Sequence, residues 1–465
     1  MPTVDLHSKA DYASIYYRTN TPHCNVGGFD PEKPTLVILH PAFLDSTWVD
    51  SQMGDSRFDN NYNIIALDMR SCGKSVCRPN GRHDSWVDAA DLAFCFQKLH
   101  LPPSHILGLE GTSIYCALRF AVLFPELCLS LTLVNVPAPV EVKWIYKNVD
   151  ELIHAACFAE DLDLFEQAAF ECIEFLFGPL IAYWETNMCP SKRARTAETT
   201  SLYINRAPMS PEAYSLITQP VLIIQGEKNE LCPAKHAERL LSQLTGVKDG
   251  AVIYEVKGGR SMISVIPGYT SIVNNVFYKF LMRLPHHRSD IVPPKVSLKD
   301  RMKTALNKLS EITGLDTISL DPLCSISFSC VTPDFFKGQT ELLRHYLKDA
   351  SQAFTPTPVE GMPLRKYSQR ERDEWSYIER GRLSNGTALS GTAASHPDRV
   401  KVEVERTKTS SRPEQQQSPT DTPLLKTAFS SSAMGVNEKQ TTKKSRTFKG
   451  VDHTQTTASS HRMLA

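Results

Sequence analysis

Short apolar runs alternate with helical patterns through the first 285 residues, and this alternation constrains the fold more than any other feature of the chain. The candidate strands are residues 35–40, 62–69, 105–110, 129–136, 220–226 and 251–256. Helical patterns separate them, at residues 85–99, 113–124, 234–244 and 270–284. Because strands covered on both faces are almost continuously apolar, these runs predict an α/β fold, with a mainly parallel sheet between two layers of helices. In such sheets, ligands bind beyond the carboxyl ends of the strands.

One segment interrupts the alternation. From residue 142 to residue 205 the pattern is helical throughout, as in WIYKNVDELIHAACF and AEDLDLFEQAAFECIEFLF. A helical insertion after a parallel strand begins at the carboxyl end of that strand, which is the end of the sheet where ligands bind. We therefore predict a helical lid, with bounds 140–208, over the candidate site.

The composition changes after residue 285, and residues 286–384 are predicted to form a partly helical extension. Its clearest helix begins after Ser297 as N-cap, has apolar residues such as Leu306 at helical spacing, and stops at Gly314. A second helical pattern covers residues 339–348.

The last part of the chain, residues 385–465, consists mostly of Ser, Thr, Gln, Lys and Pro. Such a composition buries too little apolar area to offset the entropy lost on ordering, so we predict a disordered tail. The predicted order of domains is therefore a main domain over residues 1–285, the extension, and this tail.

Charge and cysteine content exclude several function classes. The 51 Lys and Arg residues balance 51 Asp and Glu residues, so the chain creates no net field that attracts nucleic acid. Twelve cysteines without a C-x-x-C pair, and an N-terminus without an apolar signal segment, favour a cytoplasmic protein with reduced thiols. No apolar run reaches the roughly 18 residues that a membrane span requires. We expect no metal and no cofactor. The basic run KKSR at residues 443–446 keeps a nuclear location open, and protein partners of the tail stay unidentified.

Four segments in a fixed order carry a family resemblance. They are LVILHPAFLDSTW, ALDMRSCGKS, LGLEGTSIYCALRFAVLFPELCLSLTLVN and VLIIQGEKNELCP. Their order and spacing over about residues 10–285 resemble the α/β-hydrolase family, of the AB hydrolase-1 type. The resemblance implies an α/β-hydrolase fold in which a sharp strand-to-helix turn, the nucleophile elbow, presents the reactive residue.

The three catalytic positions of that family are occupied by unsuitable residues. The family mechanism uses a Ser nucleophile, an Asp or Glu, and a His, in this chain order. Alignment on neighbouring anchors places these positions at Gly111, Asn229 and Arg260. The elbow reads Leu-Glu-Gly-Thr-Ser, and the loop at residues 257–267 contains no histidine. The triad is therefore degenerate, and ordinary serine hydrolysis is not expected.

Other groups near the elbow keep some chemistry open. The backbone N–H groups of Ala42 and Thr112 are the positional candidates for an oxyanion hole. Ser113 is an alternative nucleophile, although Tyr115 stands where the elbow needs a second glycine. Ser113 is more simply explained as a serine at the start of a helix.

Two hypotheses concern Glu110 and Arg260. If the loop of Arg260 lies over the elbow, its guanidinium could form an ion pair with Glu110 and fill the vacated site. Alternatively, Arg260 and the Thr112 N–H could hold a carboxylate or another anion.

The sequence thus supports two functions. The first is a non-catalytic protein that binds a small-molecule ligand in a lidded pocket or serves as a scaffold. The alternative is an active hydrolase of a small ester that uses displaced catalytic groups.

Overall fold

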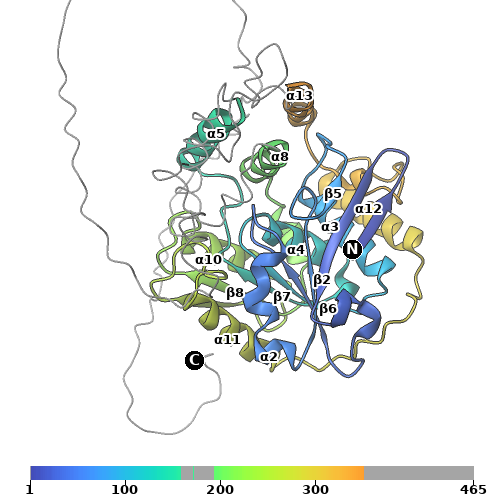
Figure 1. Ribbon diagram of the computed structural model, residues 1–465, viewed down its shortest axis with the longest axis vertical. Helices are drawn as coiled ribbons and strands as arrows, with labels where there is room; N and C mark the ends of the chain where they lie inside the picture. Colours follow the sequence, from blue (N-terminus) through green and yellow to red (C-terminus); the bar gives the residue numbers. More distant parts are fainter. Residues whose placement is uncertain (1, 159–170, 172–192, 350–465) are drawn as a thin grey trace, which may run out of the picture. The chain divides into compact units, whose positions relative to one another are not determined.

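The computed structural model describes residues 2–158, 171 and 193–349, and its core is a nine-stranded sheet (Figure 1). The predictions for the tail and for most of the segment between residues 159 and 192 lie outside the described residues. The strands are β1 (Thr3–His7), β2 (Tyr12–Thr19), β3 (Thr35–Leu39), β4 (Asn63–Leu67), β5 (Val76–Cys77), β6 (Ser104–Leu109), β7 (Cys128–Val134), β8 (Val221–Gly226) and β9 (Val252–Val256). They follow the order β1-β2-β4-β3-β6-β7-β8-β9, and β5 pairs with β2.

Six strands from β4 to β9 in this order run parallel, whereas β1, β2 and β5 pair in antiparallel fashion. The parallel strands are the six that the sequence predicts. The interior strands bury both faces, because alternate residues enter two separate apolar clusters. The edge strand β9 differs, since Val252 and Ile253 are exposed and Val256 is buried. In β3, Val37 and Leu39 belong to one cluster and Leu36 and Ile38 to the other. The predicted mainly parallel sheet is therefore confirmed.

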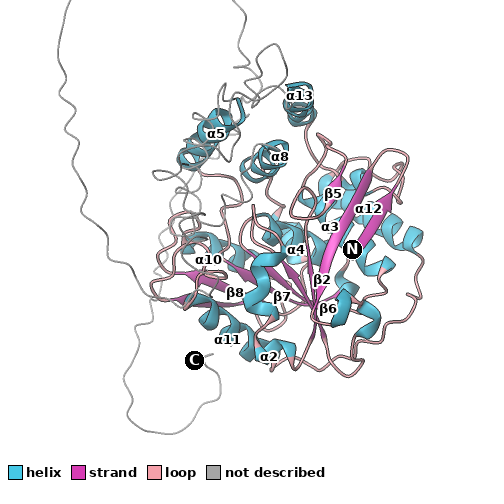
Figure 2. Ribbon diagram, in the orientation of Figure 1, coloured by secondary structure: helices cyan, strands magenta, loops and turns pink. Residues whose placement is uncertain are grey.

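Helices cover both faces of the sheet (Figure 2). Those that contribute to the larger cluster are α3 (Ser85–Lys98), α4 (Thr112–Leu123), α9 (Pro211–Ser215), α10 (Ala234–Gln243) and α12 (Leu298–Thr313). Those that contribute to the smaller cluster are α1 (Asp50–Met53), α2 (Ser56–Asp59) and α11 (Tyr269–Leu281). Within the described residues, the remaining helices are α5 (Lys143–Phe158), α8 (Arg193–Ile204) and α13 (Pro333–Asp349), and short 3-10 turns include η4 (Pro125–Leu127) and η7 (Ser325–Phe328).

The predicted lid region is helical where the structure describes it. Helices α5 and α8 contact one another, and α8 also contacts α13. At the base of this region, Ile145 and Leu202 are buried. The lid role itself stays a prediction.

The extension after residue 285 packs onto the sheet domain. Helix α12 has the predicted ends: the Ser297 side chain accepts a hydrogen bond from the Asp300 N–H, and Gly314 adopts a left-handed conformation. Its apolar face, which includes Leu306 and Leu309, belongs to the larger core cluster. Helix α13 begins at Pro333, six residues before the predicted pattern.

Polar contacts also join the extension to the start of the chain. Ser289 bonds to Thr35 on β3, and the Cys324 thiol accepts a hydrogen bond from Ser8. The Cys330 N–H donates to the Asp84 carboxylate, at 2.7 Å.

Candidate functional site

The predicted elbow is present as a sharp turn between β6 and α4. Gly111 is the N-cap of α4, with φ 75° and ψ −132°, and Glu110 before it also has a positive φ of 54°. Residues with a Cβ rarely adopt this conformation. The turn therefore keeps the strained geometry of a nucleophile elbow although a glycine occupies its tip.

Ala42 lies directly against this tip. A Cβ added to Gly111 would come within 2.4 Å of the Ala42 Cβ, far inside the contact distance of two carbon atoms. The Ala42 N–H donates to the Glu110 carbonyl at 3.1 Å, which holds the loop after β3 in this place. The position where a nucleophile side chain would begin is thus occupied.

The two candidate oxyanion donors differ in their surroundings. The Ala42 N–H is engaged by the Glu110 carbonyl and would have to leave it to bind an oxyanion. Thr112 is the first residue of α4, where backbone N–H groups have no partner within the helix.

Ser113 points away from any site. Its side chain is fully buried, and its hydroxyl donates to the carbonyls of Leu109 (2.8 Å) and Glu110 (3.2 Å). The structure therefore supports the simpler explanation of Ser113, a serine that satisfies the backbone at the start of a helix.

Asn229 has a local structural role after β8. Its side-chain oxygen accepts hydrogen bonds from the N–H groups of Leu231 (3.1 Å) and Cys232 (2.9 Å). This contact closes the turn that leads to α10. An amide so placed cannot supply the carboxylate that orients a catalytic histidine.

Solved structures of several hydrolases resemble the chain. They include a hydrolase from Pseudomonas aeruginosa, with 18% identity and a TM-score of 0.48 over 60% of this chain and 98% of that protein. An esterase from Exiguobacterium antarcticum has 16% identity and a TM-score of 0.48 over 61% of this chain and all of that protein. An enol-lactonase from Burkholderia xenovorans has 16% identity and a TM-score of 0.45, with the same coverage. No protein-family model matches the sequence, and no curated protein matches it.

At these identities the likeness concerns the fold alone. The fold is therefore assigned from the sheet and the turn of this chain. Parallel strands flank β6, and β6 leads through the strained turn at Gly111 into α4. The chain has the α/β-hydrolase fold. In this α/β-hydrolase-fold chain, the turn of the resemblance motif ALDMRSCGKS is also formed. Asp68 accepts hydrogen bonds from the Ser46 and Lys74 N–H groups, and Arg70 binds Asp91 and Asp11.

The expected ion pair between Arg260 and Glu110 is wrong. Arg260 is exposed, and only its backbone carbonyl reaches the region of the elbow, where it accepts a hydrogen bond from the Asn135 side chain. The Glu110 carboxyl instead accepts hydrogen bonds from the Asn135 amide (2.9 Å) and the Ser264 N–H (3.4 Å). Close packing of the Gly226 and Gly259 backbones fixes the loop so that the Arg260 side chain faces outward.

Glu110 is nevertheless a buried acidic residue without an ion pair among the residues that the structure describes. It is 5% exposed, and no Lys, Arg or His within the described ranges forms an ion pair with it. Burial raises its pKa to about 7, against the opposing effect of the hydrogen bonds from Ser264 and Asn135. Its carboxyl faces Asn135 and Ser264, where it stabilises the loop after β9.

The histidine after β3 supports the same turn. His40 is buried, its Nε2 accepts a hydrogen bond from the Met69 N–H, and its Nδ1 therefore carries the proton and donates to the Pro41 carbonyl at 2.8 Å. Both ring nitrogens have structural partners, in agreement with the structural role that the resemblance implies.

A buried network at the base of the lid region was not visible in the sequence. Arg206, just after α8, donates to the Glu141 carboxylate (2.7 Å) and to the Tyr115 hydroxyl (2.9 Å). Its guanidinium also lies over the Tyr203 ring, 4.6 Å from the ring centre. Tyr115 thus fills the place of the second elbow glycine and joins the two ends of the 140–208 segment. Partners 91 residues apart leave no sequence signal.

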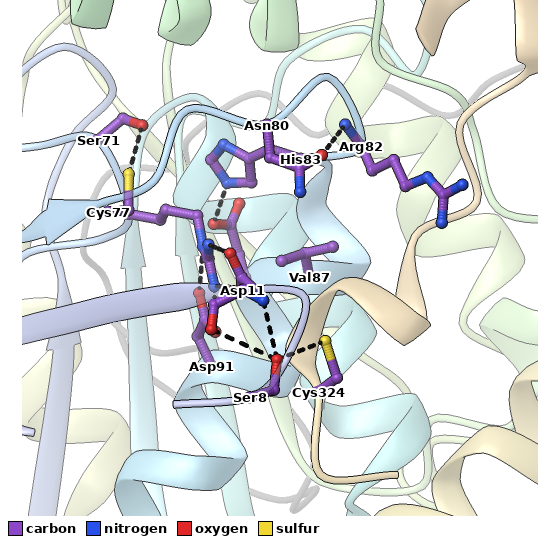
Figure 3. A network of polar contacts seen from close by, with 12 residues as sticks. Ser8, Asp11, Ser71, Cys77, Asn80, Arg82, His83, Val87, Asp91 and Cys324 are labelled. Carbon is purple, nitrogen blue, oxygen red and sulfur yellow. Dashed lines mark hydrogen bonds and ion pairs between the residues drawn. The ribbon is translucent and has the colours of Figure 1, made fainter. Parts of the chain in front are cut away.

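A second network connects the turn after β4 with α3 (Figure 3). Figure 3 shows Asp11, Asp91 and His83 converging below the loop that carries Asn80 and Arg82. Within it, Arg70 binds Asp91 through two hydrogen bonds, of 2.8 and 2.9 Å, and reaches Asp11. Buried charges with such full partners stabilise one arrangement of these elements.

Two cavities lie outside these predicted site residues. One, of about 20 Å³, lies beside Asp88, Arg70 and Cys116 and has room for about one water molecule. The other is a groove of about 350 Å³, lined by residues such as Arg57, Tyr254 and Ile272.

In the described part of the chain, no cluster of three His, Cys, Asp or Glu side chains is arranged to hold a metal ion. No helix there is long and apolar enough to cross a membrane.

Proposed function

We propose that this chain is a non-catalytic protein with an α/β-hydrolase fold, which binds a small molecule or a protein partner without converting it. The contact of Ala42 with the Gly111 tip carries the proposal, since it occupies the position from which a nucleophile would act. The retained elbow then serves to hold β6, α4 and the loop after β3 together.

The other two triad positions support the same conclusion. Asn229 closes a turn, and the Arg260 side chain faces outward, so neither can take or orient a proton at the elbow. In a serine protease, loss of the nucleophile or of the base alone lowers the rate by about a million-fold. A chain without any of the three should have no measurable serine hydrolase activity.

A fluorophosphonate probe combined with hydrolysis of a small p-nitrophenyl ester tests this proposal. We expect no labelling of the wild type and no ester hydrolysis beyond that of the Ser113→Ala variant. Ser113 is the informative control because it is the alternative nucleophile that the sequence of the elbow offers. Labelling that disappears in Ser113→Ala would instead establish an active hydrolase with displaced groups.

Binding is tested separately, through the anion that Arg260 and the Thr112 N–H were expected to hold. Because the Arg260 side chain faces outward, small carboxylates should shift the melting temperatures of the wild type and of the Arg260→Ala variant equally. A smaller shift in Arg260→Ala would instead support an anion site that includes Arg260.

A further inference from the structure

His83 is a buried histidine between two carboxylates that belong to different parts of the fold. It lies in the loop before α3 and is 5% exposed. Its Nε2 is 2.7 Å from the Asp88 carboxylate in the first turn of α3. Its Nδ1 lies 3.5 Å from the Glu198 carboxylate.

Glu198 belongs to α8 and is the only described acidic residue of that helix. Its other carboxylate oxygen accepts a hydrogen bond of 2.6 Å from the Ser71 hydroxyl, in the turn after β4. Glu198 is 5% exposed, so α8 inserts one carboxylate into the body of the sheet domain. Burial of an ionised carboxylate is costly unless a cation or several hydrogen bonds compensate for the lost water, and Glu198 has the Ser71 hydroxyl and His83.

The neighbouring cation cannot replace His83 in this role. Arg70 is already paired with Asp91 and Asp11. If His83 lost its proton, Asp88 and Glu198 would remain as two buried carboxylates without a cation between them, and separation of α8 from the domain would return Glu198 to water.

We propose that protonated His83 holds helix α8 on the sheet domain through its ionic contact with Glu198, and that docking of α8 weakens when His83 loses its proton. Two further contacts of α8 among the described residues keep their strength over the same range of pH. Arg195 donates to the Gly73 carbonyl at 2.9 Å, and Ser201 bonds to Gln339 of α13. An arginine stays protonated, and the Ser201 contact carries no charge.

The groups around His83 are mostly acidic or neutral. Helix α13 covers the loop with uncharged groups, since Phe336 and Thr340 lie against Gly81. The titratable and charged groups that face His83 are Asp88 and Asp84 from the start of α3, Glu198 from α8, Cys77 from β5, and Arg70 from the turn after β4.

The direction of the pH effect follows from these charges. Desolvation by burial opposes the protonated form, but Asp88 and Glu198 outweigh it and hold the pKa of His83 well above its ordinary value of 6.5. A histidine whose pKa is raised in the docked state contributes fully to docking below the ordinary value. That contribution is lost as pH rises through the raised value. Docking of α8 should therefore weaken on the alkaline side of neutrality.

Hydrogen exchange of the full-length protein tests this role of His83, with exchange rates corrected for the intrinsic effect of pH. We expect the protection of the α8 amides, relative to those of α11, to fall about tenfold or more between about pH 6 and about pH 9. His83→Gln should lower α8 protection at both pH values and remove most of the pH dependence. Glu198→Gln should likewise remove it, and His286→Gln, at an exposed position, should behave as wild type.

Two results would contradict the proposed role of His83. One is α8 protection in the wild type that is equal at both pH values, and the other is unchanged pH dependence in His83→Gln. Loss of α11 protection in His83→Gln would show that this variant fails to fold. In that case, NMR titration of the histidines in the wild type tests the protonation of His83 directly. One buried ring must stay protonated at a pH where a free imidazole is neutral. The readout is independent of hydrolysis, so it does not depend on the outcome for the proposed function.

Discussion

At the scale of single residues, the vacated site is closed by packing rather than by charge. Ala42 occupies the space in front of Gly111, and Ser113 and Asn229 have turned to the backbone. The sequence was sufficient to identify the three replaced positions, because each lies at a fixed distance from a recognisable anchor. It was insufficient to predict what filled the space, since Ala42 and Gly111 meet through the register of the neighbouring strands β3 and β6, in which Leu39 pairs with Gly108.

The tip of the elbow should not accept a side chain. Gly111→Ser should destabilise the fold by about 2–5 kcal/mol, because a positive φ and a close contact with Ala42 act together. Urea denaturation measures the free energy of unfolding. Gly250→Ser is the matched control, since Gly250 has φ 74° with no atom within 4 Å of an added Cβ, and should cost only about 1–2 kcal/mol.

A double variant separates the two causes. Ala42→Gly should recover about 1 kcal/mol or more of the loss in Gly111→Ser, because it removes the contact but not the backbone strain. Equal costs at positions 111 and 250 would show that Ala42 does not occupy the site.

Glu110 should make the stability of the protein depend on pH. The folded-state pKa of about 7 lies above the ordinary value of 4.5, so the folded state binds more protons than the unfolded state between these values. The contribution of Glu110 is therefore lost as pH rises from about 4.5 to about 7, by up to about 3 kcal/mol. Unfolding free energies of wild type and Glu110→Gln, compared at both ends of this range, measure it. An unchanged difference between the two proteins would contradict the raised pKa.

At the scale of elements, burial decided which parts of the sequence were predictable. Five of the six parallel strands bury both faces and appear as continuous apolar runs, whereas the edge strand β9 was recognised although it is largely exposed. Strand β1 buries only alternate residues and spans just Thr3–His7, and β5 has two residues, so neither produced a pattern strong enough to be recognised. Strand β2 was also missed, although it is mostly buried, because its sequence YASIYYRT mixes apolar residues with Ser, Arg and Thr. Arg260 was placed on the correct loop, but its direction depends on backbone contacts that no pattern encodes.

The ends of the 140–208 segment should depend on the pair of Arg206 and Glu141. Both side chains are almost fully buried, at 3% and 1% exposure. Arg206→Met should therefore lower the free energy of unfolding by about 3–5 kcal/mol, since it leaves the Glu141 carboxylate buried without a partner. Adding Glu141→Leu should restore much of that loss.

The exposed pair of Lys147 and Glu151 on α5 provides the control, with side-chain exposures of 74% and 65%. Lys147→Met should change stability by no more than about 0.5 kcal/mol. A similarly small effect of Arg206→Met would indicate that water reaches the buried pair.

At the scale of the whole molecule, the sheet domain depends on chain that follows residue 285. Met302, Leu306 and Leu309 of α12, together with Phe328, belong to the same core cluster as the strands. The segment after residue 285 therefore contributes a helix to the core of the sheet domain.

Truncation should distinguish a required helix from an accessory one. A chain that ends at Asp349 keeps every described contact of the domain and should unfold at the same temperature as the full-length protein. A chain that ends at residue 285 loses several buried side chains, each worth about 2–5 kcal/mol, against a total stability of about 5–15 kcal/mol. It should show no cooperative thermal transition and should aggregate in gel filtration.

In the full-length chain, Leu306→Asp should have a similar effect. Lys303→Asp, at an exposed position of the same helix, should not. Cooperative unfolding of the shorter chain would instead show that the sheet closes its core without α12.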